Sequence, residues 1–214
     1  MRIAVIGATG MAGSTIVAEA VARGHHVDAL SRSPRADSDD HRLTVHAIDV
    51  ADVDALDPVF ASVDAVVLAV RLAPGDEGRL TQLTCGVLDT AALYGTQVLI
   101  IGGAAPLRSP GNPSRLLIDD PRYVRDAWKS IAQASLDQFH ACQAHPYGGW
   151  TYLSPSAVLE PGVRNGRYRR GLTTLLVDDN GDSRITAADL AIAVVDELES
   201  PGTDRHFTVA SHAV

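Results

Sequence analysis

The stretch that decides the fold is Met1–Gly13, which reads M-R-I-A-V-I-G-A-T-G-M-A-G. Its apolar, β-type run over residues 3–6 ends at Gly7, and from Met11 onward apolar residues recur with a helical period. This order predicts a strand, a glycine turn and a helix. A strand of this kind at the start of a chain, followed by such a turn, is typical of a dinucleotide-binding unit.

The three glycines of this turn have separate physical roles. Gly7 permits the tight turn, Gly10 lets the backbone approach a pyrophosphate, and Gly13 lets the helix pack closely on the strand. The free N–H groups at the helix N-terminus then face the phosphates. The spacing is G-x-x-G-x-x-G and not the more familiar G-x-G-x-x-G, and a glycine turn without a ligand is the alternative interpretation.

The end of the second apolar run bears on the choice of cofactor. This run, Val27–Leu30, is followed by Ser31 and Arg32, with Arg35 close behind. In a dinucleotide fold an acid at this position binds the ribose 2′-hydroxyl, whereas an arginine can pair with a 2′-phosphate. The sequence therefore favours NADP(H) over NAD(H). The alternative is that Arg32 is only a solvated loop charge.

Further apolar runs alternate with helical patterns along the chain. They predict an α/β fold, a Rossmann-type doubly wound parallel sheet with a small substrate-side elaboration at the C-terminal end. We expect one domain over 1–214, with a cofactor part over about 1–150 and substrate-side elements over about 151–214. Residues 104–120 read as a loop, and Asp119-Asp120-Pro121 reads as the start of a helix that continues through Phe139. The remaining strands are expected at 43–48, 64–70, 97–101 and 150–154.

Composition narrows the functional classes. The formal net charge of −8 argues against a nucleic-acid or anionic-membrane partner, because both require clustered positive charge. Since the first residues already belong to a strand and no apolar run approaches the ~20 residues that span a bilayer, we expect a cytoplasmic protein. Cys85 and Cys142 indicate neither a disulfide framework nor a zinc site, and the histidines show no metal-ligand spacing.

By its motifs the chain resembles the atypical branch of the short-chain dehydrogenase/reductases, which includes NmrA-like and NADH-flavin-reductase-like NAD(P)-binding proteins. The motifs are G-A-T-G-M-A-G at 7–13, D-A-V-V-L-A-V at 64–70, I-I-G-G-A at 100–104, W-T-Y-L-S-P at 150–155 and P-G-V-R-N-G-R-Y-R-R-G at 161–171. The likeness extends to F-T-V-A at 207–210. It is specific for the fold and much less specific for the reaction.

The resemblance implies a set of cofactor contacts at the carboxyl ends of the strands. Arg32 would bind the 2′-phosphate, and Asp49 with Val50 would flank the adenine. The other implied contacts are Gly7, Thr9, Gly10 and Met11 at the pyrophosphate, Ala69 and Val70 along the nicotinamide ribose, and Gly102 and Gly103 at the end of the fifth strand.

The chain departs from the wider superfamily at its acid–base residues. That superfamily uses Y-x-x-x-K, in which the lysine lowers the pKa of the tyrosine. Here Ala127 lies four residues after Tyr123, and Lys129 lies six residues after it, about 600° around a helix. Pro106 stands where relatives tend to have a serine, which leaves Ser109 and Ser154 as nearby candidates.

These features favour an NADPH-dependent reductase that transfers hydride to a planar acceptor such as a flavin or quinone. Such a reaction tolerates the loss of a dedicated acid, because solvent can supply the proton. Tyr123, Tyr152 and Ser154 are candidates for lining the pocket or donating a proton. The alternatives are an NmrA-like NADP(H) sensor without catalysis and a biosynthetic ketoreductase or epimerase. The expected partner is a small planar acceptor, and a homodimer is compatible with the sequence.

Two further motifs carry competing interpretations. D-D-N-G-D at 178–182 faintly resembles a calcium loop, but Asn180-Gly181 is a strong hairpin turn, which we prefer. The arginines around Tyr168 could guide an anionic substrate or flavin phosphate, and a solvated hairpin is the preferred alternative. These arginines are Arg164, Arg167, Arg169 and Arg170.

Overall fold

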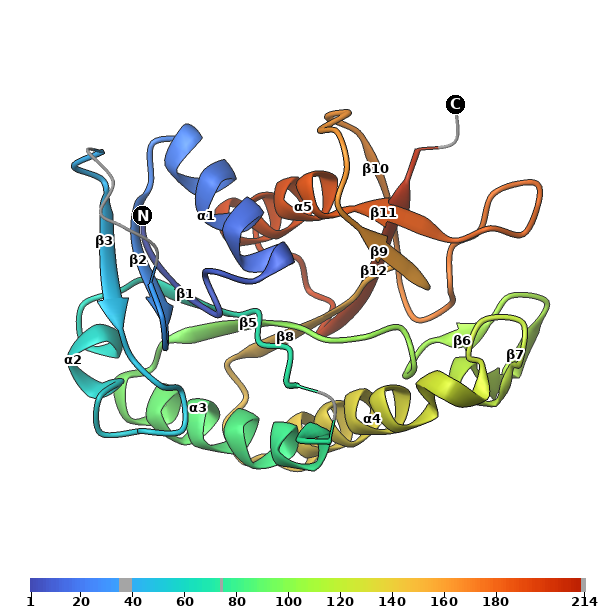
Figure 1. Cartoon of the computed structure of the whole chain (residues 1–214), viewed down its shortest axis with the longest axis horizontal. Helices are drawn as coiled ribbons and strands as arrows, with labels where there is room; N and C mark the ends of the chain where they lie inside the picture. The colour runs from blue at the N-terminus through green and yellow to red at the C-terminus, as the bar shows by residue number, and fades with distance from the viewer. Residues whose placement is uncertain (35–39, 74, 213–214) are drawn as a thin grey trace.

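The computed structural model describes residues 1–34, 40–73 and 75–212. Its centre is an eight-stranded sheet in the order β3-β2-β1-β4-β5-β8-β12-β10 (Figure 1). Neighbouring strands are parallel throughout, except that β10 at the edge runs antiparallel to β12. The strands are β1 (Arg2–Ile6), β2 (His26–Ser31), β3 (Leu43–Ala47), β4 (Ala65–Leu68), β5 (Gln97–Ile101), β8 (Trp150–Ser154), β10 (Tyr168–Gly171) and β12 (His206–Ser211).

Helices cover both faces of this sheet (Figure 1). α1 (Met11–Ala22) and α5 (Ala187–Glu199) lie on one face, and α2 (Asp57–Phe60), α3 (Leu80–Tyr94) and α4 (Lys129–Ala144) lie on the other. Because side chains alternate along a strand, Ile3 and Val5 of β1 join the core beneath α1 and α5, whereas Ala4 and Ile6 join the opposite core.

The strand order confirms the predicted Rossmann-type doubly wound sheet. From β1 the chain first builds outward through β2 and β3, then crosses to the other side of β1 and adds β4, β5 and β8. The direction reverses between β1 and β4, and ligands of such sheets bind at the carboxyl end of this switch point. A ligand is therefore expected to bind at the turn after β1 and the segment after β4.

The substrate-side elements are built on small pairs of strands. A hairpin joins β6 (Arg108–Ser109) to β7 (Asn112–Leu116), and β9 (Val158–Glu160) pairs in parallel with β11 (Arg184–Thr186). Short 3-10 helices η1 (Glu77–Arg79), η2 (Leu117–Asp119) and η3 (Asp126–Trp128) complete the chain. A third apolar cluster, which includes Leu107, Leu117, Leu136 and Leu175, packs the hairpin against α4.

The expected helix start at Asp119-Asp120-Pro121 is wrong, because α4 begins only at Lys129. Asp120 does not cap a helix. It accepts hydrogen bonds from the Arg122 guanidinium and from the Ser109 hydroxyl, and these hold its pKa well below the usual range. The expected loop at 104–120 likewise contains the β6–β7 hairpin.

The turn at Asn180-Gly181 is present, but the hairpin expected around it is wrong. The Asp178 carboxylate accepts hydrogen bonds from the backbone N–H groups of Asn180 and Asp182, both at 2.9 Å, and Gly181 has φ +84°. The strand that follows, β11, pairs with β9. In the ranges that the structure describes, no three His, Cys, Asp or Glu residues cluster as a metal site would require. Nor does any helix in those ranges have the length and apolar character needed to cross a membrane.

The basic cluster around Tyr168 is also not a solvated hairpin. β10 is an edge strand of the main sheet. Arg170 forms an ion pair with Glu197 of α5, and Arg164 forms one with Glu19 of α1. These arginines therefore connect the substrate-side segment to the two helices that cover one face of the sheet.

Candidate cofactor and acceptor site

The glycine turn after β1 is closed by its own backbone. The N–H groups of Gly7 and Ala8 donate to the Leu30 carbonyl at 2.9 and 3.1 Å, and the Gly10 N–H donates to the Gly7 carbonyl at 3.0 Å. Gly7 has φ +88°, and a Cβ on it would lie 2.5 Å from the Ala69 carbonyl oxygen. Only glycine fits here, and the turn lies directly against the segment that follows β4.

The N-terminus of α1 is left open by this turn. Its N-cap residue is Gly10, which has no side chain to cap the helix, and the first helical hydrogen bond is Ser14 N–H to Gly10 C=O at 2.9 Å. The N–H groups of Met11, Ala12 and Gly13 therefore have no partner within the helix. Together with the positive end of the helix dipole they form an anion-binding cradle that fits a pyrophosphate.

The predicted cofactor-selecting residue Arg32 directly follows β2. Ser31 is buried at the end of the strand, whereas Arg32 is exposed and makes no hydrogen bond or ion pair with any residue that the structure describes. Its guanidinium is therefore available to an external anion. Arg35 lies outside the described residues.

The nearest acid, Asp28, is not available to a ribose hydroxyl. It is 2% exposed and accepts hydrogen bonds from Arg2 Nε at 2.6 Å and from His46 Nε2 at 2.7 Å. Burial raises the pKa of Asp28, but these hydrogen bonds outweigh it and leave the pKa below the ordinary value. The Asp28 carboxylate is thus bound within the sheet and is not free to accept a ribose hydroxyl.

The other residues implied by the resemblance lie at the same edge, because parallel strands end there together. Asp49 and Val50 follow β3, Ala69 and Val70 follow β4, and Gly102-Gly103 follows β5. Asp49 is exposed, and its carboxylate accepts the Ala51 N–H at 3.0 Å. Thr9 lies in the glycine turn. The topology therefore brings every predicted cofactor residue to one edge of the sheet.

Tyr152 has a different role from the predicted one. It is fully buried, and a Cβ on Gly102 would lie 2.0 Å from its hydroxyl. That hydroxyl donates to the Ser135 carbonyl at 3.0 Å and lies 3.2 Å from Gln138 Oε1, while burial raises its pKa. The Ser135 hydroxyl in turn accepts the Gly103 N–H at 2.9 Å. Tyr152 therefore packs against the Gly102-Gly103 turn and supports it from within the core, which corrects the prediction that it lines the pocket.

Ser154 and Tyr123 are also engaged inside the protein. Ser154 is fully buried, with its hydroxyl 2.9 Å from His206 Nε2, and this placement argues against the predicted role of lining the pocket or donating a proton. Burial lowers the pKa of His206 to about 4. Tyr123 is half-buried, and its hydroxyl donates to the Gly181 carbonyl at 3.1 Å. The further candidate Ser109 is buried against Asp120.

Sequence reasoning missed the polar residues that support the site. Ser135 and Gln138 are buried on α4, and Gln138 Nε2 also donates to Thr84 Oγ1 of α3 at 3.0 Å. The only signal was the recurrence of polar residues on the apolar face of a helix. The continuous run W-T-Y-L-S could have shown that Tyr152 is a core residue, because a central parallel strand is buried on both faces.

Comparison with known proteins places this geometry in a family. A family model described as NAD(P)H-binding matches residues 7–201. The chain is 35% identical to the Bacillus subtilis protein YwnB over 216 residues, which covers all of both chains.

Two solved structures share the fold over nearly the whole length. A "putative NADH-flavin reductase" from Streptococcus pneumoniae is 27% identical with a TM-score of 0.89, and the match covers 99% of this chain and 100% of the other. A "putative epimerase" from Bacteroides thetaiotaomicron is 31% identical with a TM-score of 0.89 and covers 100% and 98%. With the open glycine turn at the switch point, these matches show that the chain belongs to the NAD(P)H-binding family, in the atypical branch of the short-chain dehydrogenase/reductases.

Proposed function

We propose that the protein is an NADPH-dependent reductase that acts on a small planar acceptor, such as a flavin or a quinone. The observation that carries the cofactor preference is the Arg32 guanidinium at the end of β2, which has no partner among the described residues, whereas the acid Asp28 inside the strand is buried and already bonded. An unpaired arginine at this place suits a 2′-phosphate.

The chain supplies the remaining contacts with the cofactor through its backbone. The open N–H groups at the start of α1 bind the pyrophosphate, and Gly10 keeps a side chain out of its way. The Gly102-Gly103 turn, supported by Ser135 and Tyr152, holds the end of β5 in place. When bound, NADPH supplies the hydride for the reduction.

The choice of acceptor class rests on the three hydroxyl groups that were candidates for donating a proton. Tyr152 and Ser154 are buried, and Tyr123 is hydrogen-bonded to the backbone. Reduction of a flavin or quinone needs two rings held in register and can take its proton from solvent. Epimerisation would need an acid and a base at the substrate, so the likeness to the "putative epimerase" supports this function less well than the "putative NADH-flavin reductase" supports a reductase.

The test is a titration followed by turnover in the same cuvette. Purified protein is titrated with NADPH, NADP⁺ and NADH, and then mixed with FMN, FAD, biliverdin and a set of quinones while the nicotinamide absorbance is followed. Tight NADPH binding with oxidation by one class of acceptor is expected. Tight binding without any oxidation would overturn the reductase and favour a redox sensor of the NmrA type.

A cytosolic location is part of this proposal. Both Cys85 and Cys142 are free thiols, which suits a reducing compartment. The acidic net charge of −8 is compatible with the same location.

A further inference from the structure

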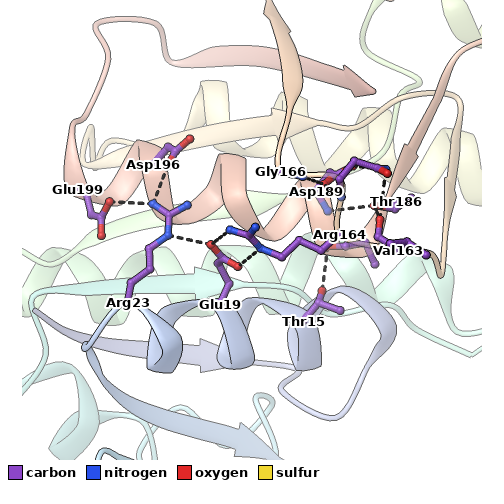
Figure 2. A network of polar contacts seen from close by, with 12 residues as sticks. Thr15, Glu19, Arg23, Val163, Arg164, Gly166, Thr186, Asp189, Asp196 and Glu199 are labelled. Carbon is purple, nitrogen blue, oxygen red and sulfur yellow. Dashed lines mark hydrogen bonds and ion pairs between the residues drawn. The ribbon is translucent and has the colours of Figure 1, made fainter. Parts of the chain in front are cut away.

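Arginines beside α1 and α5 are bound to carboxylates of the same chain (Figure 2). Arg23 forms ion pairs with Asp196 and Glu199 of α5 at 2.6 and 2.9 Å. Glu19 of α1 accepts from Arg23 Nε at 2.8 Å and from Arg164 Nε at 2.9 Å. The charges of these two arginines are therefore balanced inside the protein. In a chain with a formal net charge of −8, an arginine without such a partner is the better candidate to bind an external anion.

Arg71 is such an arginine. Its side chain is exposed and forms no hydrogen bond or ion pair with any residue of the described ranges 1–34, 40–73 and 75–212. It lies three residues beyond the end of β4, on the segment that leaves the sheet at the switch point. Because Ala69 and Val70 are apolar, Arg71 is the first charged residue after this strand.

The backbone that precedes Arg71 lies directly against the glycine turn. The Ala69 N–H donates to the Ile6 carbonyl at 2.9 Å. A Cβ on Gly7 would lie 2.5 Å from the Ala69 carbonyl oxygen and 3.3 Å from the Val70 nitrogen. Arg71 follows one residue later, a step of about 3.8 Å between Cα atoms. The contact between the two backbones therefore places Arg71 beside the turn that opens α1.

The pyrophosphate cradle at this turn has no cation of its own. Residues 7–13 contain no charged side chain, and the start of α1 contributes roughly half a positive charge, whereas both phosphates of a pyrophosphate are anionic. Arg32 follows β2, where it suits the 2′-phosphate. Asp49, which follows β3, is an exposed acid and adds negative charge. A further phosphate at the switch point therefore requires another cation.

We propose that Arg71 binds a phosphate group at the switch point. This group is either the pyrophosphate of the nicotinamide cofactor or the phosphate of an acceptor such as FMN, because both present the same anionic oxygens. A guanidinium can bind two of these oxygens through parallel N–H···O bonds. The inference rests on the proposed function, and it adds to the site a cation that the glycine turn lacks.

The first test is a cofactor titration that needs no acceptor. Arg71→Met removes the charge, and Arg205→Met is its matched control, because Arg205 is an exposed arginine that directly precedes β12 at the opposite, amino end of the strands. If the pyrophosphate is the ligand, Arg71→Met weakens NADPH and NADH alike, about tenfold, since both contain it. Arg71→Lys keeps the charge and should restore part of this affinity. Arg205→Met should bind both cofactors as the wild type does.

A comparison of FMN with riboflavin tests the second source of phosphate, because the two flavins share their ring system and differ in the phosphate. If the acceptor phosphate is the ligand, Arg71→Met raises the KM for FMN about tenfold and leaves riboflavin and both cofactor affinities unchanged. Unchanged cofactor affinities together with an unchanged preference for FMN over riboflavin would overturn the proposal.

Flavin binding without turnover separates this proposal from the reductase itself. If the wild type reduces no acceptor, the proposed reductase is wrong. The role of Arg71 is then decided by the cofactor titration and by the affinities for FMN and riboflavin, measured from flavin fluorescence with NADP⁺ present. A wild type that binds neither cofactor nor flavin would contradict both the reductase and the phosphate site.

Discussion

Arg32 is the residue whose surroundings most directly separate the two nicotinamide cofactors. It is exposed and unpaired among the described residues, whereas Asp28 is held by Arg2 and His46. Arg32→Ala should weaken NADPH binding about 10- to 100-fold, because a hydrogen bond to a charged group contributes roughly 1.5–3 kcal/mol. NADH binding should change by less than about twofold, since NADH has no 2′-phosphate. Fluorescence titration with both cofactors measures this difference.

A matched variant separates a specific contact from a general loss of positive charge. Arg115 is an exposed arginine on β7, and Arg115→Ala removes the same charge away from the end of β2. It should leave the affinity ratio of NADPH to NADH unchanged. Equal losses of NADPH and NADH affinity in Arg32→Ala would show that Arg32 is only a surface charge.

The β1–turn–α1 element depends on a close backbone contact. A Cβ on Gly13 would lie 2.1 Å from the Gly7 carbonyl oxygen and 2.8 Å from its carbon, so Gly13→Ala must push α1 away from the turn. We expect the free energy of unfolding to fall by about 1–3 kcal/mol and NADPH affinity to fall at least about tenfold. Urea unfolding and cofactor titration check the two effects. Gly78→Ala, where a Cβ meets nothing within 4 Å, should stay within about 0.5 kcal/mol in stability.

Elements of this kind could be predicted because their causes are local. A strand that is buried on both faces must be apolar throughout, and a glycine turn must carry its glycines. The segment 104–128 was different, since Asp119-Asp120-Pro121 has the composition of a helix start while Asp120 is bound by Ser109 and Arg122. The Glu19–Arg164 pair joins residues 145 positions apart. No local pattern predicts such a contact, because it exists only once the sheet has formed.

At the scale of the whole molecule, buried ionisable groups tie stability to pH. Hydrogen bonding to Arg164 is the main cause of the lowered Glu19 pKa. At Asp28 burial raises the pKa, but the hydrogen bonds outweigh burial, so that this pKa is lowered as well. The ordinary pKa values of these groups are 4.5 and 3.8. A carboxylate whose folded pKa is depressed contributes stability above its ordinary pKa and loses it as pH falls. Acid should therefore loosen the contacts of α1 and of β1 with β2 only below about pH 4.5.

His206 makes the stability of the protein depend on pH over a second, less acidic range. Burial lowers its pKa from 6.5 to about 4, so between these values the unfolded chain binds a proton that the folded protein does not. The contribution of the neutral His206 to the free energy of unfolding is fully present above about pH 6.5. The free energy of unfolding then falls by up to about 3 kcal/mol as pH approaches 4. His206→Gln cannot titrate, so its unfolding free energy should decline less steeply over this range in urea unfolding. His41→Gln, at a side chain that is 85% exposed, should follow the wild-type curve. Parallel curves for His206→Gln and the wild type would show that the half-buried imidazole does not control stability in mild acid.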